Sequence, residues 1–148
     1  MSKSAWRTRS AVEGARVLDA FAGTGALGLE ALSRGAARAT FIEQDRGALM
    51  VLRRNLAALG EEERARVIHG DATRPPPGEP CTLVLLDPPY GKDLVPRALA
   101  ALLVAGWITP GALVAAEVGK SDPLSPDGFE LAAERAHGAA RLVFLRAV

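Results

Sequence analysis

Short apolar runs alternate along the chain with longer segments whose apolar residues recur every three or four positions. Five of the runs are typical of buried strands: 17–18, 39–42, 66–69, 82–86 and 112–116. Three segments between them have helical spacing: about 26–34, the leucine-rich stretch that Asp45 can cap, and about 95–103. This alternation predicts βαβ units around a parallel sheet, which is an α/β fold.

The last two segments break the alternation. Residues 129–135 and 141–146 have no helical spacing, and Ala136, His137 and Gly138 separate them. This pattern predicts a hairpin of edge strands at one side of the sheet.

Length and composition limit the protein class. A chain of 148 residues is the size of one domain. The single cysteine, Cys81, cannot form an internal disulfide, and its place at the start of an apolar strand predicts a packed, inert thiol. The first residues lack the apolar core of a signal peptide, and no run approaches the ~20 apolar residues of a membrane span. We therefore expect a cytoplasmic protein with no membrane association.

Charge is nearly balanced overall but uneven along the chain. The formal net charge of +1 gives no general attraction to nucleic acid. The first sixteen residues, however, hold four basic side chains and one acidic side chain. We expect a basic N-terminal arm at 1–12 and the folded domain at 13–148. The arm could meet phosphates or could be a solvated, partly disordered terminus, and both interpretations stay open.

A glycine-rich turn follows the first strand. Gly23, Gly25 and Gly28 form a G-x-G-x-x-G motif, in which glycine permits a tight turn and close approach of a ligand to the backbone. The motif alone is weak, because it suits NAD as well as other nucleosides.

Three acidic residues at successive strand ends narrow the choice of cofactor. Glu43 stands about 20 residues after the turn, where a carboxylate can bind ribose hydroxyls. Asp71 could accept from an adenine amino group, although a loop or capping role explains it as well. Asp19 would repel a pyrophosphate but suits a cationic amino group. Together they favour S-adenosylmethionine over NAD.

A second special loop follows the fourth strand, with the sequence Asp87-Pro88-Pro89-Tyr90. The prolines stiffen the chain, and Asp87 and a neighbouring carbonyl could grip the exocyclic amine of a nucleobase. Tyr90 offers an aromatic face for stacking that base. The loop thus predicts methyl transfer to an amine of a base that is flipped out or unpaired, without choosing the base.

These segments resemble the RsmD family of small-subunit ribosomal RNA guanine-N2 methyltransferases. The resemblance runs from residue 13 onward and rests on residues 19–36 and on Leu86-Asp87-Pro88-Pro89-Tyr90-Gly91-Lys92. Gly106-Trp107-Ile108, followed by the strand that ends at Glu117, also fits. It implies a class I, Rossmann-like methyltransferase fold with a mixed seven-stranded sheet whose last strand is antiparallel. It also implies catalysis on guanine N2 within an assembling 30S-type particle, with small-subunit ribosomal RNA and ribosomal proteins as partners. We expect a monomer without a metal.

The resemblance also assigns roles to residues. Asp19, Ala22, Gly23 and Gly25 would bind the methionine part of S-adenosylmethionine, Glu43 the ribose, and Asp71 with Ala72 the adenine. The guanine would be held by Asp87, Pro88, Pro89 and Tyr90.

The chain departs from the family before residue 13, where members carry some tens of residues that include a basic hairpin. This departure leaves open a truncated S-adenosylmethionine-binding protein without catalysis. An N6-adenine methyltransferase acting on DNA or RNA also stays open, because such enzymes share the Asp-Pro-Pro-Tyr sequence. An NAD oxidoreductase is disfavoured by the charge of Asp19.

Overall fold

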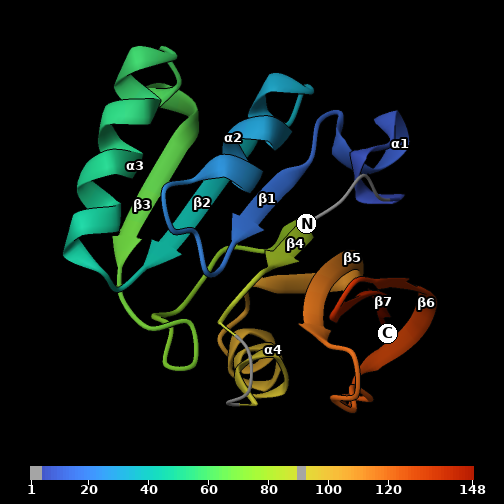
Figure 1. The fold of residues 1–148 in the computed structure, drawn as a ribbon. Helices are drawn as coiled ribbons and strands as arrows, with labels where there is room; N and C mark the ends of the chain where they lie inside the picture. The colour runs from blue at the N-terminus through green and yellow to red at the C-terminus, as the bar shows by residue number, and fades with distance from the viewer. Residues whose placement is uncertain (1–4, 90–92) are drawn as a thin grey trace.

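Seven strands form one sheet in the order β3-β2-β1-β4-β5-β7-β6, in a computed structural model that describes residues 5–89 and 93–148 (Figure 1). The strands are β1 (Arg16–Asp19), β2 (Arg38–Glu43), β3 (Ala65–His69), β4 (Cys81–Leu86), β5 (Ile108–Gly119), β6 (Phe129–His137) and β7 (Ala140–Ala147). The helices are α1 (Arg9–Val12), α2 (Ala26–Ser33), α3 (Arg46–Ala58) and α4 (Leu94–Val104), with short 3-10 turns at η1 (Ala5–Arg7) and η2 (Glu62–Arg64).

The first five strands are parallel, as the alternation of strands and helices predicts. Strand β7 is antiparallel to both β5 and β6. The prediction of a C-terminal hairpin is confirmed, but the prediction that both of its strands are edge strands is wrong. β7 pairs on both sides, and its side chains at 142–145 are buried, so β6 alone of the two lies at the edge.

The sheet separates two apolar layers. Helices α2 and α3 cover one face, and α4 covers the other (Figure 1). The first layer includes Phe41, Leu32 and Leu52, and the second includes Trp107 and Leu102. β5 is longer than the predicted run at 112–116, because its first four residues continue the strand beyond the buried segment.

Local sequence signals set the helix ends. The Asp45 side chain accepts a hydrogen bond from the Ala48 N–H at 2.8 Å, which caps α3 as predicted. After α2, Gly35 has φ +103°, a left-handed conformation that favours glycine.

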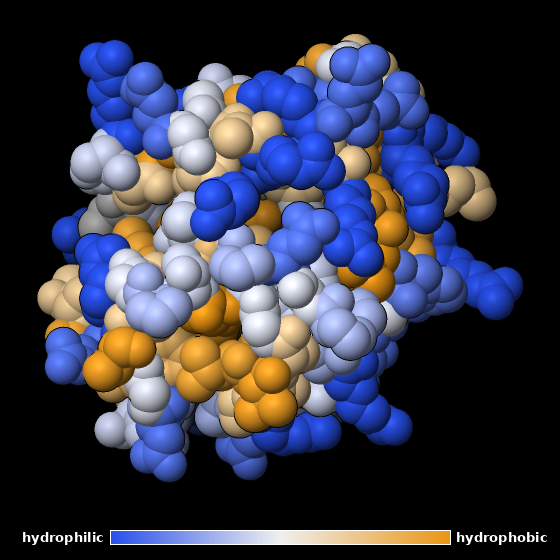
Figure 2. All heavy atoms as spheres, turned by 180° about the vertical axis from the view of Figure 1, so that it is seen from behind, coloured by the Kyte–Doolittle hydropathy of each residue, from blue (hydrophilic) through white to orange (hydrophobic). Residues whose placement is uncertain are grey.

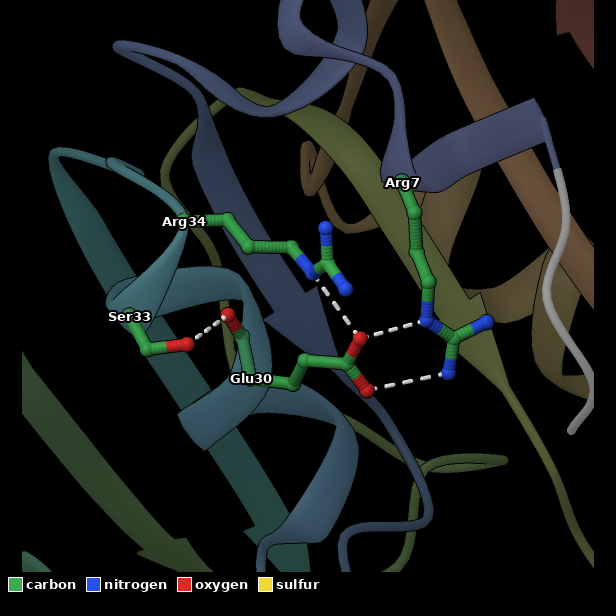
Figure 3. A network of polar contacts seen from close by, with 4 residues as sticks. All are labelled: Arg7, Glu30, Ser33 and Arg34. Atoms are coloured by element: carbon green, nitrogen blue, oxygen red, sulfur yellow. Dashed lines mark hydrogen bonds and ion pairs between the residues drawn. The ribbon is translucent and has the colours of Figure 1, made fainter.

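The segment before the first strand is docked on the domain. Trp6 and Val12 are fully buried in the layer that contains α2 and α3. Arg7 forms two hydrogen bonds with the Glu30 carboxylate, at 2.5 and 3.0 Å, and Arg34 contacts the same carboxylate at 2.9 Å (Figure 3). Of the two interpretations left open for this segment, a partly disordered terminus does not describe residues 5–12, because the burial of Trp6 and Val12 and this charge network hold them on the domain.

The face opposite to that of Figure 1 is largely polar, with its apolar residues in separate patches (Figure 2). Among the described residues, few large apolar side chains are strongly exposed; Val104 at 89% and Leu59 at 63% are examples. No helix among these residues is long and apolar enough to cross a membrane.

Candidate active site at the carboxyl edge of the sheet

The parallel strands β1 to β5 end at one edge of the sheet, which we call the carboxyl edge. The loops that follow line a cavity of about 420 Å³. Open α/β sheets bind their ligands at this edge. The cavity is lined by Ala20, Phe21, Gly23, Ile42, Glu43, Gln44, Gly70, Asp71, Ala72, Asp87, Pro88 and Pro89.

Most of the predicted site residues meet in this cavity. The lining includes Gly23, Glu43, Asp71, Ala72, Asp87, Pro88 and Pro89, which come from the end of β2 and from the loops after β1, β3 and β4. Asp19, Ala22 and Gly25 are not part of the lining, and all three are buried. Tyr90 lies outside the described residues.

Asp19 ends β1 with a carboxylate that is only partly satisfied. Its side chain is 1% exposed, and Oδ2 accepts a hydrogen bond from the Gly28 N–H at 3.0 Å. Oδ1 has no hydrogen-bond partner within the described part of the chain. Burial raises the pKa of Asp19 to about 7; the Gly28 N–H opposes this rise, while the negative charges of Asp87 and Glu43 add to it. A buried oxygen without a donor fits a cationic amino group.

The three motif glycines serve different purposes. Gly23 lines the cavity with φ +57°, and a Cβ there would meet nothing within 4 Å, so its backbone is open to a ligand. Gly25 has φ +92°, and a Cβ there would collide with Leu52. A Cβ on Gly28 would collide with the Phe41 ring. Gly25 and Gly28 are therefore required for close packing of α2 and α3 on the sheet, and Gly23 is the motif glycine that faces the cavity.

Glu43 is held rigidly at the end of β2. Its Oε1 accepts a hydrogen bond from the Gly23 N–H at 2.7 Å, and its Oε2 accepts one from the Asp45 N–H at 2.8 Å. An ionised carboxylate has about four lone-pair sites, so each oxygen can accept one more hydrogen bond. This arrangement fits a pair of ribose hydroxyls.

Asp71 has a structural role in addition to its place on the cavity wall. Its Oδ1 accepts hydrogen bonds from the Thr73 backbone N–H at 2.8 Å and from the Thr73 hydroxyl at 2.7 Å. These two bonds hold the pKa of Asp71 below its usual value. Asp71 therefore has the loop-stabilising role that the sequence left open, and its two bonds with Thr73 orient the carboxylate at the cavity.

Asp87 is half-buried and pairs with an acidic residue on the neighbouring strand. Burial raises the pKa of Asp87 to about 6, and the charge of Glu117 and a side-chain hydrogen bond with it add to the rise. Two carboxyl groups in hydrogen-bonding contact share a proton or repel each other. Such a pair attracts N–H donors.

Sequence reasoning missed several residues at the site, among them Ala20, Ile42 and Gly70 in the cavity lining. Phe21 and Gln44 line the cavity, and Glu117 contacts Asp87. Phe21 stands in the predicted glycine turn. Glu117 follows the predicted strand at 112–116, but its contact with Asp87 depends on the register of β5 against β4, which the sequence does not supply.

Other polar residues near the strands have structural roles. Cys81 is buried and burial raises its pKa to about 11, so the prediction of a packed thiol is confirmed. The His69 Nε2 lies 3.0 Å from the Gln44 carbonyl oxygen. Among the described residues, no three His, Cys, Asp or Glu side chains are grouped as a metal site would require.

Comparison with known proteins identifies the relatives of this chain. A family model described as conserved hypothetical protein 95 matches residues 4–146. The chain is 41% identical to ribosomal RNA small subunit methyltransferase D of Escherichia coli K12 over 128 residues, which is 84% of this chain and 64% of that protein. It is 39% identical to the protein of the same name from Haemophilus influenzae over 127 residues, 82% of this chain and 66% of that protein. The chain thus spans just under two thirds of these relatives.

Solved structures agree with the fold. The yhhF protein of Escherichia coli superposes with a TM-score of 0.85 at 36% identity, covering 93% of this chain and 78% of that one. TrmN of Thermus thermophilus superposes with a TM-score of 0.78 at 27% identity, covering 97% of this chain and 47% of that one. The fold is that of class I, Rossmann-like methyltransferases, as the sequence resemblance implied.

Proposed function

The chain belongs to the conserved hypothetical protein 95 family, the RsmD family, and from this premise we propose that it methylates the exocyclic N2 amine of a guanine in small-subunit ribosomal RNA, with S-adenosylmethionine as methyl donor. The proposed substrate is an assembling 30S-type particle in the cytoplasm, and the proposed active form is a monomer. One observation carries this proposal: the glycine turn and the Asp-Pro-Pro loop, 60 residues apart in sequence, line the same cavity.

The cavity residues, together with Asp19 outside the lining, fit S-adenosylmethionine in chemical character. The buried, unpartnered Oδ1 of Asp19 suits the amino group of the methionine part, and the Gly23 backbone is open to the ligand in the cavity wall. The fixed carboxylate of Glu43 suits the ribose hydroxyls, and Asp71 with Ala72 suits the adenine. Bound there, S-adenosylmethionine supplies a methyl group on a positively charged sulfur.

The Asp-Pro-Pro loop orients the amine that receives this methyl group. An exocyclic amine is a poor nucleophile, because its lone pair is delocalised into the ring. Asp87 at the cavity wall would accept a hydrogen bond from the amine, while the rigid Pro88 and Pro89 hold the carboxylate in place. The carboxylate of Asp87 can also accept the proton that the amine loses, since its pKa of about 6 exceeds that of a protonated aromatic amine.

Small ribosomal subunits that lack this methylation provide the test. The protein is incubated with such subunits and S-adenosylmethionine labelled in its methyl group, and the RNA is then digested to nucleosides. We expect the label in N2-methylguanosine at one position of the small-subunit RNA. Label in N6-methyladenosine would contradict the choice of base. Tight binding of S-adenosylmethionine with no transfer would instead favour a binding protein without catalysis.

A further inference from the structure

A second carboxylate stands beside the proposed amine-binding residue. In the parallel pairing of β4 with β5, Leu86 is opposite Ala116. Asp87, the first residue after β4, therefore lies beside Glu117, which is still within β5. Their side chains are hydrogen-bonded to each other. Both side chains are half-buried, so the pair is accessible to a ligand while partly shielded from water.

The two carboxylates meet at the wall between two hollows. Pro88 and Pro89 line the large cavity together with Asp87, and they also line a small second cavity. Glu117 lines that second cavity with Asp122. A planar base bound between the two cavities could place one donor beside Asp87 in the large cavity and the neighbouring donor beside Glu117 in the small one.

We infer that Glu117 reads the ring N1–H of the target guanine while Asp87 holds its N2 amine, which makes Glu117 a specificity-determining residue. The inference rests on the proposed function for the identity of the reaction. Its new content is a residue and a mechanism for choosing guanine over adenine.

The edge of guanine matches a pair of acceptors. Guanine presents two neighbouring donors, N1–H and the N2 amine, and carboxylates accept from such donors. Adenine presents its N6 amine next to an unprotonated N1. If Asp87 held the amine of adenine, the N1 lone pair would point at the Glu117 carboxylate. Two hydrogen-bond acceptors, adenine N1 and Glu117, would then face each other. A mismatch of this kind costs roughly 10- to 100-fold in affinity.

The electrostatics of the free site favour the same ligand. At pH 8 most molecules have lost the proton on Asp87, because its pKa is about 6, and the two carboxylates then repel each other. Two N–H donors placed between them relieve this repulsion. A ligand with only one donor relieves it in part.

Binding of nucleotides tests the inference without methyl transfer. Guanosine 5′-monophosphate is compared with the 5′-monophosphate of 2-aminopurine riboside, which keeps the 2-amino group but has an unprotonated N1. Dissociation constants are measured by ligand-observed NMR at pH 8. We expect wild type to bind the guanine nucleotide about 10- to 100-fold more tightly. Equal binding of the two nucleotides would overturn the inference, and this comparison requires no variant.

The variant Glu117→Gln sharpens the test. A glutamine amide can donate to the unprotonated N1 of 2-aminopurine, so we expect the preference for guanine to shrink to within about threefold. The matched control is Glu63→Gln, an exposed carboxylate on η2, which should keep the wild-type preference. An unchanged preference in Glu117→Gln would refute the role of Glu117. Because the readout is binding, a failure to methylate ribosomal subunits would count against the proposed function alone.

Discussion

The pKa values of acidic residues are shifted in opposite directions at the docked N-terminal segment (5–12) and at the carboxyl edge of the sheet. Where the N-terminal segment docks, Glu30 is contacted by both Arg7 and Arg34, and these partners hold its pKa below the usual value, the Arg7 hydrogen bonds most of all. At the carboxyl edge, burial raises the pKa of Asp19 to about 7 and that of Asp87 to about 6. In the first region, ion pairs hold the chain in place. In the second region, carboxyl groups keep hydrogen-bonding capacity for a ligand.

This difference separates stability from function within one small domain. A carboxylate with arginine partners contributes to folding. A buried carboxylate with a spare oxygen costs folding free energy and is retained where a ligand completes it. Substitutions in the first region should therefore reduce stability, whereas substitutions at the carboxyl edge should reduce ligand binding or catalysis without destabilising the fold.

The largest effect is expected from Asp87→Ala. It removes the proposed acceptor of the target amine, and we expect methyl transfer to fall by 10³-fold or more, equivalent to about 4 kcal/mol of transition-state stabilisation. Binding of S-adenosylmethionine should stay within about threefold of wild type, because Asp87 is not among the proposed cofactor ligands. Transfer is measured with labelled cofactor, and binding by calorimetry. Near-wild-type transfer would remove Asp87 from the mechanism.

The second effect is a loss of stability on Trp6→Ala. The indole is fully buried and packs in the layer beneath α2 and α3. Its removal leaves a large cavity, and we expect the free energy of unfolding to fall by about 3–5 kcal/mol in urea denaturation. Leu59→Ala, at a side chain that is 63% exposed, is the control and should change stability by less than about 1 kcal/mol. A small effect of Trp6→Ala would mean that the N-terminal segment does not stabilise the domain.

Much of the fold follows from the sequence, because hydrophobic periodicity reports burial directly. The strand at 82–86 and the helix that Asp45 caps were predictable from apolar spacing and one capping residue. The sequence could not reveal that β7 lies between β5 and β6, because both hairpin strands have similar patterns and strand order depends on pairing across the sheet.

The site was predictable where a residue follows a strand and not where tertiary contacts decide its role. Glu43 and Asp87 stand at strand ends, and parallel strands bring such ends to one edge. That Gly25 serves helix packing emerges only from its contact with Leu52 across the layer. The basic residues before β1 left a phosphate-binding arm and a solvated terminus both open, and neither interpretation revealed that Arg7 pairs with Glu30, a partner 23 positions away.

A third prediction concerns the charge of Asp19. The variant Asp19→Asn keeps the shape of the side chain but removes its negative charge. We expect the dissociation constant for S-adenosylmethionine to rise by roughly 30- to 100-fold at pH 8, since a charge-assisted hydrogen bond is worth about 2–3 kcal/mol. The wild-type protein should also bind the cofactor more weakly below pH 7, where Asp19 is protonated, and the variant should lack this dependence. Calorimetry from pH 5.5 to 8 checks both, and equal affinities at pH 8 would exclude Asp19 from the cofactor site.

The smallest predicted effect is the pH dependence of stability, in which the two regions have opposite signs. The pKa of Asp19 is raised on folding, so the folded state binds its proton more tightly, and stability falls as pH rises from about 4 through 7. The pKa of Glu30 is lowered, so its contribution is present above the ordinary value of 4.5 and is lost as pH falls through the folded value. Stability should therefore be highest near pH 4, where the raised pKa values of Asp19 and Asp87 favour the folded state, and should decline toward pH 8.

Two variants separate these contributions to the pH profile. Asp19→Asn should flatten the decline above pH 5, with a smaller part remaining from Asp87. Glu30→Gln should lower the free energy of unfolding by about 1 kcal/mol at pH 7, because the carboxylate is 30% exposed and solvent screens its ion pairs. Urea denaturation at intervals from pH 4 to 8 measures all three proteins. If Asp19→Asn kept the wild-type decline, the buried carboxylate would not be the source of strain at the carboxyl edge, and the contrast between the two regions would rest on Glu30 alone.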